Sequence, residues 1–231
     1  MSGGGRLALF DLDGTLLSGD TDALWCEFLM SEGVLDRDAF EAANRDVVER
    51  YGRGVITPAE FCAFYAGTLR GQGAAGWAPH RERFVATVIA ARIPASARAL
   101  VDSHRDAGDT LVLTTATNRF LTEPIADLLR VDALIATELE SGDAGGDESR
   151  VFTGRNAGVL NMREGKVERV HAWLASRGAE DSTLSAATFY SDSINDLPLL
   201  RAVGRPVVVD PDVRLMAEAA ARGWRVLSLA R

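Results

Sequence analysis

The chain has 231 residues, of which 47 % are hydrophobic and 25 % charged, so it fits one large globular domain or a core domain with an insertion. Its formal net charge of −8 argues against a nucleic-acid partner and, more weakly, against an anionic membrane surface. No run of 18 apolar residues exists, and the start, MSGGGRLALF, lacks the pattern of a signal peptide. The two cysteines, Cys26 and Cys62, are expected to be buried thiols of a reduced, cytoplasmic protein.

Short apolar runs of strand length recur along the chain. They are nearly continuous rather than alternating, which is typical of parallel strands covered on both faces. The predicted strands are residues 6–10, 110–115, 133–137, 187–191 and 206–210, with 224–229 as an additional edge strand. The predicted helices between them are residues 96–107, 119–130 and 213–222 and a segment that contains Val167, Val170 and Leu174. This alternation predicts an α/β fold with a doubly wound parallel sheet.

One long interval, residues 19–90, shows only helical patterns. The TPAE sequence that starts at Thr57 has the spacing of a capping box with proline in the first helical turn. The apolar residues that follow it at helical spacing are Phe61, Phe64, Tyr65 and Leu69. They are expected to form the core of a small helical unit, within one chain or between the two chains of a homodimer. We therefore predict a core of residues 1–18 and 91–231 with a helical insertion at 19–90.

Polar side chains stand where three predicted strands end. Asp11 and Asp13 follow the first strand, Thr115 ends the second, and SDSIND follows the fourth at residues 191–196. The carboxyl ends of parallel strands meet at one sheet edge, so these side chains should converge. Two carboxylates about 4 Å apart repel by roughly 4 kcal/mol at an effective dielectric near 20, so several of them need a cation or protonation. Oxygen ligands without histidine or cysteine suit Mg²⁺.

Lys166 is predicted at the start of a helix. A lysine at a helix N-terminus could form an anion site, and the alternative is a solvated lysine beside Glu164 and Glu168. A carboxylate nucleophile, Mg²⁺, a lysine and a hydroxyl together describe phosphoryl transfer through an aspartyl phosphate.

Four motifs in this order resemble those of the haloacid-dehalogenase-like (HAD) hydrolases. They are Asp11-Leu12-Asp13-Gly14-Thr15, Thr115 after a strand, Lys166, and Asp192-Ser193-Ile194-Asn195-Asp196. The segment TATNRF at residues 115–120, followed by TEPIA at 122–126, resembles members named histidinol-phosphate or phosphoserine phosphatases. The resemblance implies a Rossmann-like core, a helical cap inserted after the first strand, and a Mg²⁺-dependent phosphatase.

The resemblance also implies a role for each motif residue. Asp11 would attack phosphorus, and Asp13 would protonate the leaving oxygen and then activate water. The residues implied to hold phosphate or substrate are Thr115, Ala116, Lys166 and Asn195. The implied metal ligands are Asp11, the backbone carbonyl of Asp13, Asp192 and, in the outer shell, Asp196. Two other roles for Asp196 stay open, namely to orient Lys166 or to close a capping box with Ser193.

Two positions depart from the family pattern. Ser191 stands where the fourth motif commonly begins with glycine. Asp20 falls where the phosphoserine phosphatases carry a glutamate that contacts the substrate amine; it could face a cationic substrate or cap the first helix of the insertion. The residues of the insertion that are candidates for specificity are Asp20, Asp22, Glu27, Arg53 and Arg70.

The region 138–165 is long for a connection. Residues 141–149 are predicted to be a mobile tip and 151–155 a hairpin near the site, with Arg155 at the surface. The three histidines, His80, His104 and His171, show no partner pattern and are expected at the surface.

The leading hypothesis is a phosphomonoesterase that acts on a small phosphorylated metabolite, with histidinol phosphate or phosphoserine as the best candidates. A phosphomutase or phosphotransferase would share the aspartyl phosphate but exclude water. A non-enzymatic phospho-receiver or interaction protein would not need the long helical insertion, which suits a substrate lid.

Overall fold

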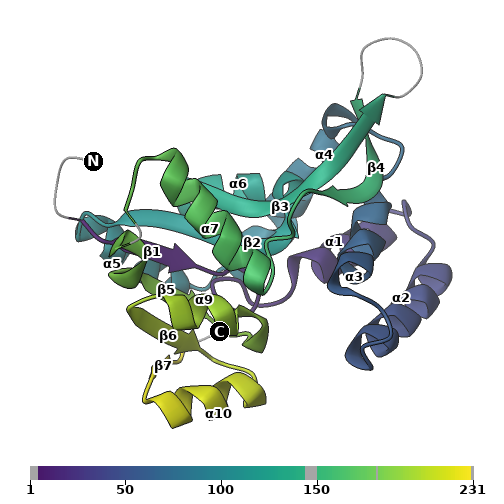
Figure 1. Cartoon of the computed structure of the whole chain (residues 1–231). Helices are drawn as coiled ribbons and strands as arrows, with labels where there is room; N and C mark the ends of the chain where they lie inside the picture. Colours follow the sequence, from purple (N-terminus) through teal and green to yellow (C-terminus); the bar gives the residue numbers. More distant parts are fainter. Residues whose placement is uncertain (1–4, 144–149, 181, 230–231) are drawn as a thin grey trace.

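The computed structural model describes residues 5–143, 150–180 and 182–229, and at its centre these form a seven-stranded sheet (Figure 1). The strand order is β4-β3-β2-β1-β5-β6-β7. The strands are β1 Leu7–Phe10, β2 Thr110–Asn118, β3 Ala133–Asp143, β4 Arg150–Ala157, β5 Thr188–Ser191, β6 Arg205–Val209 and β7 Arg225–Leu227. All neighbouring pairs are parallel except β3 and β4, which are antiparallel. The predicted parallel α/β sheet is confirmed, with one antiparallel edge added.

Helices cover both faces of this sheet (Figure 1). They are α5 Ala95–Asp106, α6 Arg119–Leu129, α7 Glu164–Ser176, α8 Ser182–Ser185, α9 Leu197–Ala202 and α10 Val213–Arg222. Ala8 and Phe10 of β1 pack in one hydrophobic cluster with α5 and α6, whereas Leu7 and Leu9 pack in another with α7. Successive side chains of a strand point to opposite faces, and both faces are buried here, so β1 is a continuous apolar run.

The interval between β1 and α5 is helical throughout its described length. It contains α1 Thr21–Ser31, α2 Arg37–Gly52, α3 Pro58–Ala66 and α4 Ala74–Phe84, followed by short helical turns to Arg92. The capping box of Thr57 and Glu60 at the start of α3 is confirmed. Tyr65 and Leu69 are buried as expected, but Phe61 and Phe64 are only half-buried. In the described part of the chain no single helix is long and apolar enough to cross a membrane, although the bent pair 74–92 and 95–106 passes that test jointly by length and composition.

A hairpin of β3 and β4 extends from the sheet edge to the insertion. β3 continues six residues beyond the predicted strand, and its added polar residues bond to β4 instead of forming the predicted loop. The predicted hairpin at 151–155 is confirmed, whereas residues 144–149 of the predicted tip lie outside the described residues. Phe152 exchanges backbone hydrogen bonds of 3.0 Å with Gly71 and Gln72, so the hairpin holds the insertion against the core.

His104 lies inside the fold rather than at the surface, so the expectation for this histidine is wrong. Its ring nitrogens lie 2.6 Å from the Asp109 carboxylate and 2.8 Å from the Tyr190 hydroxyl. Its ring also meets Phe10 edge-on. Asp109 follows α5 by three residues and Tyr190 belongs to β5, so the partners come together only in the folded chain.

Asn161 ties the sheet together beneath the polar strand ends. Its side-chain amide donates to the Thr114 hydroxyl at 3.0 Å and to the backbone carbonyls of Thr115 and Ile135 at 2.9 and 2.8 Å. It is fully buried. Asn161→Ala should therefore lower the free energy of unfolding by about 2–4 kcal/mol, because acceptors are left without a donor away from water. We expect the melting temperature to fall by roughly 5–12 °C in a thermal scan.

The control for this prediction is Val159→Ala, at a side chain that is 40 % exposed. That variant should change stability by no more than about 0.5 kcal/mol. Equal melting temperatures for both variants would show that the Asn161 network does not stabilise the sheet.

Candidate active site

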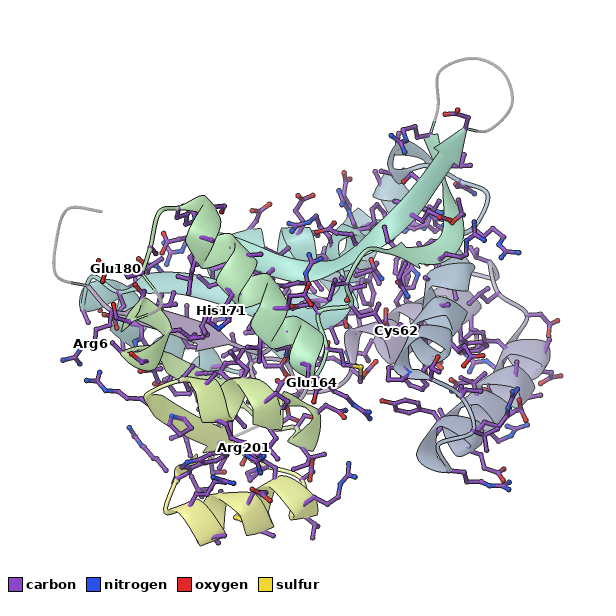
Figure 2. The ribbon with its side chains drawn as sticks, in the orientation of Figure 1. Arg6, Cys62, Glu164, His171, Glu180 and Arg201 are labelled. Carbon is purple, nitrogen blue, oxygen red and sulfur yellow. The ribbon has the colours of Figure 1, made fainter. Side chains whose placement is uncertain are left out.

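A cavity of about 410 Å³ opens at the carboxyl ends of β1, β2 and β5. The insertion forms its opposite wall with residues of α1, α2 and α3. In Figure 2, Cys62 marks the insertion side and Glu164 marks the start of α7 on the core side. All the residues predicted for catalysis, phosphate or metal binding line this cavity. They are Asp11, Asp13, Asp20, Thr115, Ala116, Lys166, Asp192, Asn195 and Asp196.

Lys166 is buried between two carboxylates. Its ammonium nitrogen lies 2.9 Å from Asp11 Oδ1 and 2.7 Å from Asp196 Oδ1, and its side chain is 2 % exposed. Burial alone would lower the lysine pKa, but the charges of Asp11 and Asp196 outweigh burial and hold this pKa above its usual value. The alternative of a solvated lysine is therefore wrong.

The sequence contains a signal for this outcome that the motif search did not use. Lys166 is the single lysine of the chain, and the other basic residues are arginines. An ammonium is a compact point charge on a flexible stem, whereas a guanidinium is a wide planar fork. The position between two buried carboxylates accepts the first and would not accommodate the second.

Asp196 contacts Lys166 and Ser191 rather than the backbone of Ser193. The Ser191 hydroxyl donates to Asp196 Oδ2 at 2.8 Å, and the backbone N–H of Ser193 donates to the Ser191 hydroxyl at 3.2 Å. The capping-box alternative for Asp196 is therefore wrong. The contacts favour its other open role, the orientation of Lys166, and they show what serine adds where the family commonly has glycine.

Asp13 is surrounded by hydroxyl groups. Its Oδ1 accepts from the backbone N–H of Thr21 at 2.7 Å and from the Thr21 hydroxyl, and its Oδ2 accepts from Thr117 at 2.8 Å and Thr115 at 3.4 Å. Burial and the nearby Asp20 charge raise the pKa of Asp13 to about 7, although these hydrogen bonds oppose the shift. A carboxyl group with this pKa can release and take up a proton near neutral pH.

The threonines around Asp13 were missed in the sequence. Thr117 lies two residues after Thr115 on β2, so the strand repeat places both on one face. That spacing could have identified Thr117. Thr21 begins α1, and nothing in the local sequence points to its contact with Asp13.

Thr15 links the carboxylates of Asp11 and Asp192. Its hydroxyl oxygen lies 2.8 Å from Asp192 Oδ1 and 3.3 Å from Asp11 Oδ2, and it accepts from the Asp192 backbone N–H at 3.0 Å. Gly14 has φ +73°, and a Cβ there would stand 2.1 Å from Asp192 Oδ2, so glycine permits this approach. Burial raises the pKa of Asp192 to about 6 and raises that of Asp11 well above its usual value.

These carboxylates fit a hard cation. Among the described residues no three His, Cys, Asp or Glu side chains are grouped as metal ligands. However, Mg²⁺ is commonly held by one or two carboxylates, with water and substrate phosphate completing its shell. Asp11 and Asp192, which share the Thr15 hydroxyl, supply two buried carboxylates whose raised pKa values show uncompensated negative charge. The donor set therefore suits Mg²⁺.

The metal-free protein should melt at a higher temperature at pH 5.5 than at pH 8. The pKa values of Asp13 and Asp192, about 7 and about 6, exceed the usual aspartate value of about 3.9, so the folded state holds more protons in this window and stability falls as the pH rises. Ion pairs that lower carboxyl pKa values, such as Glu218 with Arg222, lose stability only at lower pH. Millimolar Mg²⁺ should restore the loss at pH 8 by binding the ionised carboxylates. Thermal scans test this, and a melting temperature that rises from pH 5.5 to 8 without metal would contradict it.

The specificity candidates divide into two groups. Asp20 and Asp22 line the cavity, and Asp20 also caps α1 by accepting from the Ala23 backbone N–H at 2.8 Å. The others lie outside it: Glu27 pairs with Arg37, Arg53 pairs with Glu49, and Arg70 donates to the Thr153 carbonyl. Arg155 pairs with Glu140 and is 69 % exposed, as expected. Cavity residues that were not predicted in this role are Tyr51, Phe61, Cys62, Thr117, Met162 and Ser193.

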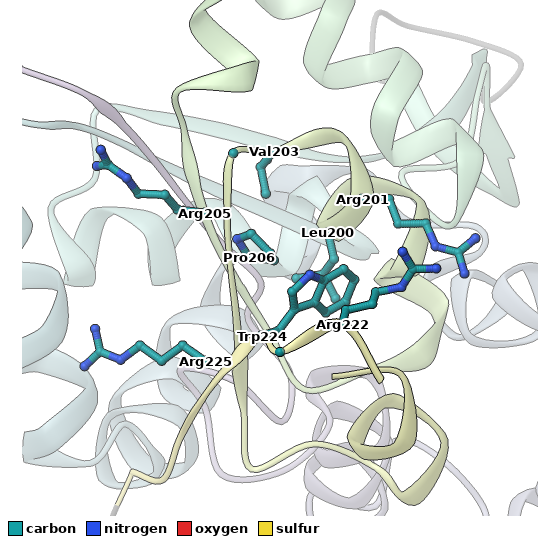
Figure 3. Close-up of a pocket in the computed structure, with 10 residues that line it drawn as sticks. Leu200, Arg201, Val203, Arg205, Pro206, Arg222, Trp224 and Arg225 are labelled. Carbon is teal, nitrogen blue, oxygen red and sulfur yellow. The ribbon is translucent and has the colours of Figure 1, made fainter. Parts of the chain in front are cut away.

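A second hollow, of about 550 Å³, lies at the opposite edge of the sheet (Figure 3). Arg205 and Arg225 stand at the amino-terminal ends of β6 and β7, and Trp224 lies between them and Arg222. Arg201 and Arg222 both pair with Glu218. None of the described residues that line this hollow is a carboxylate or a hydroxyl, so it lacks the groups for acid–base or nucleophilic chemistry.

Comparison with known proteins agrees with this site. A family model described as haloacid dehalogenase-like hydrolase matches residues 8–201. A histidinol-phosphatase of Neisseria meningitidis is 37 % identical over 223 residues, which cover 96 % of this chain and 98 % of that protein. The chain therefore belongs to the haloacid dehalogenase-like hydrolase family.

Solved structures share the fold. A protein of unknown function from Bordetella pertussis Tohama I is 42 % identical with a TM-score of 0.88, and the match covers 97 % of this chain and 99 % of that one. A substrate-bound phosphoserine phosphatase is 16 % identical with a TM-score of 0.67, and the match covers 94 % of this chain and 91 % of that one. At this identity the second likeness speaks for the fold alone.

Proposed function

We propose that the protein is a Mg²⁺-dependent phosphomonoesterase that works through an aspartyl phosphate on a small amino-alcohol phosphate. The observation that carries this proposal is the juxtaposition of Asp11, Asp13 and Lys166 at one end of the sheet. Lys166 holds one oxygen of Asp11, while Asp13 lies in the same cavity with a pKa of about 7. The relation to the Neisseria histidinol-phosphatase supports both the reaction and the substrate class.

The reaction would proceed in two steps. A carboxylate oxygen of Asp11 bonds to phosphorus, the ester P–O bond breaks, and the proton of Asp13 passes to the leaving alkoxide. Water then attacks phosphorus while Asp13 takes a proton from it, which releases phosphate and restores the Asp11 carboxylate. Mg²⁺, held by Asp11, Asp192 and the backbone carbonyl of Asp13, would offset the negative charge of the phosphoryl oxygens.

The remaining residues would position the phosphate. Lys166 adds a charge that is fixed by Asp196 and Ser191, and Thr115 and Asn195 offer polar groups to phosphoryl oxygens. The helical insertion, residues 19–90, would act as a cap over the core of residues 1–18 and 91–231. The two described free thiols are consistent with work in the reducing cytoplasm.

Two other functions differ from this proposal in their products. A mutase or phosphotransferase would move the phosphoryl group to a second hydroxyl, and a phospho-receiver would keep it on Asp11 for minutes without turnover. The cavity wall supplied by the insertion favours an enzyme that encloses a small substrate.

Phosphate release from a panel of phosphorylated metabolites, with Mg²⁺ and with EDTA, tests the proposal. The panel contains histidinol phosphate, phosphoserine, sugar phosphates and nucleotides. We expect turnover of an amino-alcohol phosphate that EDTA abolishes and added Mg²⁺ restores. No phosphate release from any compound by folded, Mg²⁺-loaded protein would overturn it.

A further inference from the structure

The charges that line the active-site cavity are strongly one-sided. The acidic residues are Asp11, Asp13, Asp20, Asp22, Asp192 and Asp196. Lys166 is the one basic residue among the described residues that line the cavity, and Asp11 and Asp196 already pair with it. Catalysis and metal binding account for the carboxylates on the core side. Asp20 and Asp22, on the insertion side, are left without a counter-charge among those lining residues.

Asp22 is the less occupied of these two. Asp20 Oδ1 accepts from the Ala23 backbone N–H as the cap of α1. The contact of Asp22 with Asn118 Nδ2 is 3.5 Å long, the limit for a hydrogen bond. Burial and the charges of Asp20 and Asp13 raise the pKa of Asp22, so a cationic group beside it would relieve this repulsion.

An aromatic wall completes this part of the cavity. The rings of Tyr51 and Phe61 stack with centroids 4.3 Å apart and planes at 25°, and both residues line the cavity. Arg163 Nη2 donates to the Tyr51 hydroxyl at 3.2 Å and its Nε donates to Asn195 at 3.2 Å. Arg163 is exposed and does not line the cavity. Carboxylates beside aromatic faces are a chemistry that recognises organic cations.

We propose that Asp22, with the Tyr51–Phe61 wall, selects phosphoesters whose alcohol part is an organic cation without a carboxylate. This inference rests on the proposed phosphatase function and narrows its substrate class. A substrate carboxylate would face Asp20 and Asp22 with no guanidinium or ammonium free to pair with it, so O-phosphoserine should be a poor substrate. Amino-alcohol phosphates, including those with an imidazole ring, should be good ones.

The test compares substrates that differ in one group. O-Phosphoethanolamine and O-phosphoserine differ only by the carboxylate, glycerol 1-phosphate is the neutral reference, and histidinol phosphate adds the aromatic ring. We expect kcat/KM for phosphoethanolamine to exceed that for phosphoserine at least tenfold. In Asp22→Asn, the ratio of kcat/KM for histidinol phosphate to that for glycerol 1-phosphate should fall about 10- to 100-fold, the effect of losing a charge-assisted contact.

The matched control is Asp38→Asn, an exposed aspartate in the first turn of α2, which should leave that ratio unchanged. A preference for phosphoserine that disappears in Arg163→Ala would overturn the inference and assign carboxylate binding to Arg163. An unchanged ratio in Asp22→Asn would also overturn it. Either result keeps the phosphatase itself, whereas silence of the wild type on all four compounds and on the wider panel would remove the proposed function.

Discussion

Asp11→Asn is expected to lower phosphate release at least about 10⁴-fold, the order of effect seen when a catalytic nucleophile is removed. The amide has nearly the shape of the carboxylate but lacks the charge and the nucleophilic oxygen. The wild-type carboxylate is held by Lys166 at 2.9 Å and stands within reach of the Thr15 hydroxyl at 3.3 Å. Phosphate release with the best substrate of the panel is the measurement.

The Asp11→Asn protein should remain folded, which separates loss of chemistry from loss of structure. The buried Asp11 carboxyl is repelled by Asp196, Asp192 and Asp13, and the substitution removes this repulsion. Lys166 keeps Asp196 as its partner at 2.7 Å. We expect the melting temperature to stay within a few degrees of wild type. A folded variant with activity within tenfold of wild type would exclude Asp11 as the nucleophile.

Lys166→Met is expected to lower both stability and activity. Removing one member of a buried ion pair typically costs about 3–5 kcal/mol, because the remaining charge is buried without a partner. Here Asp11 and Asp196, with side chains 9 % and 4 % exposed, both lose their ammonium. For a chain of this size we expect the melting temperature to fall by roughly 6–20 °C, measured in thermal scans.

A double variant shows whether the loss comes from the uncompensated carboxylates. Lys166→Met combined with Asp11→Asn should be more stable than Lys166→Met alone, because one buried charge has been removed with its partner. Mg²⁺ should also stabilise the Lys166→Met protein at neutral pH. If the double variant is less stable than either single one, packing of the lysine stem rather than its charge holds this site together.

Local sequence was sufficient wherever the determining interaction is local. The apolar run at residues 6–10 predicted β1, because a central parallel strand is buried on both faces. Asn118, Thr57 and Gly223 marked helix ends, because a cap bonds to backbone groups a few residues away. The clustering of Asp11, Asp13 and Asp192 followed from strand order alone, since the carboxyl ends of parallel strands meet at one edge.

Tertiary structure decided the features that depend on partners distant in the chain. Residues 138–143 became strand because β4 pairs with them, although their polar composition suggested a loop. The Lys166 ammonium is buried because Asp11 and Asp196, 155 and 30 residues away, converge on it. The substrate side of the cavity, Asp22 beside the Tyr51–Phe61 wall, exists only after the insertion has packed over the sheet edge. The sequence by itself determined the chemistry at the strand ends, because backbone geometry carries those side chains there, whereas charge pairing and substrate contacts needed the packed fold.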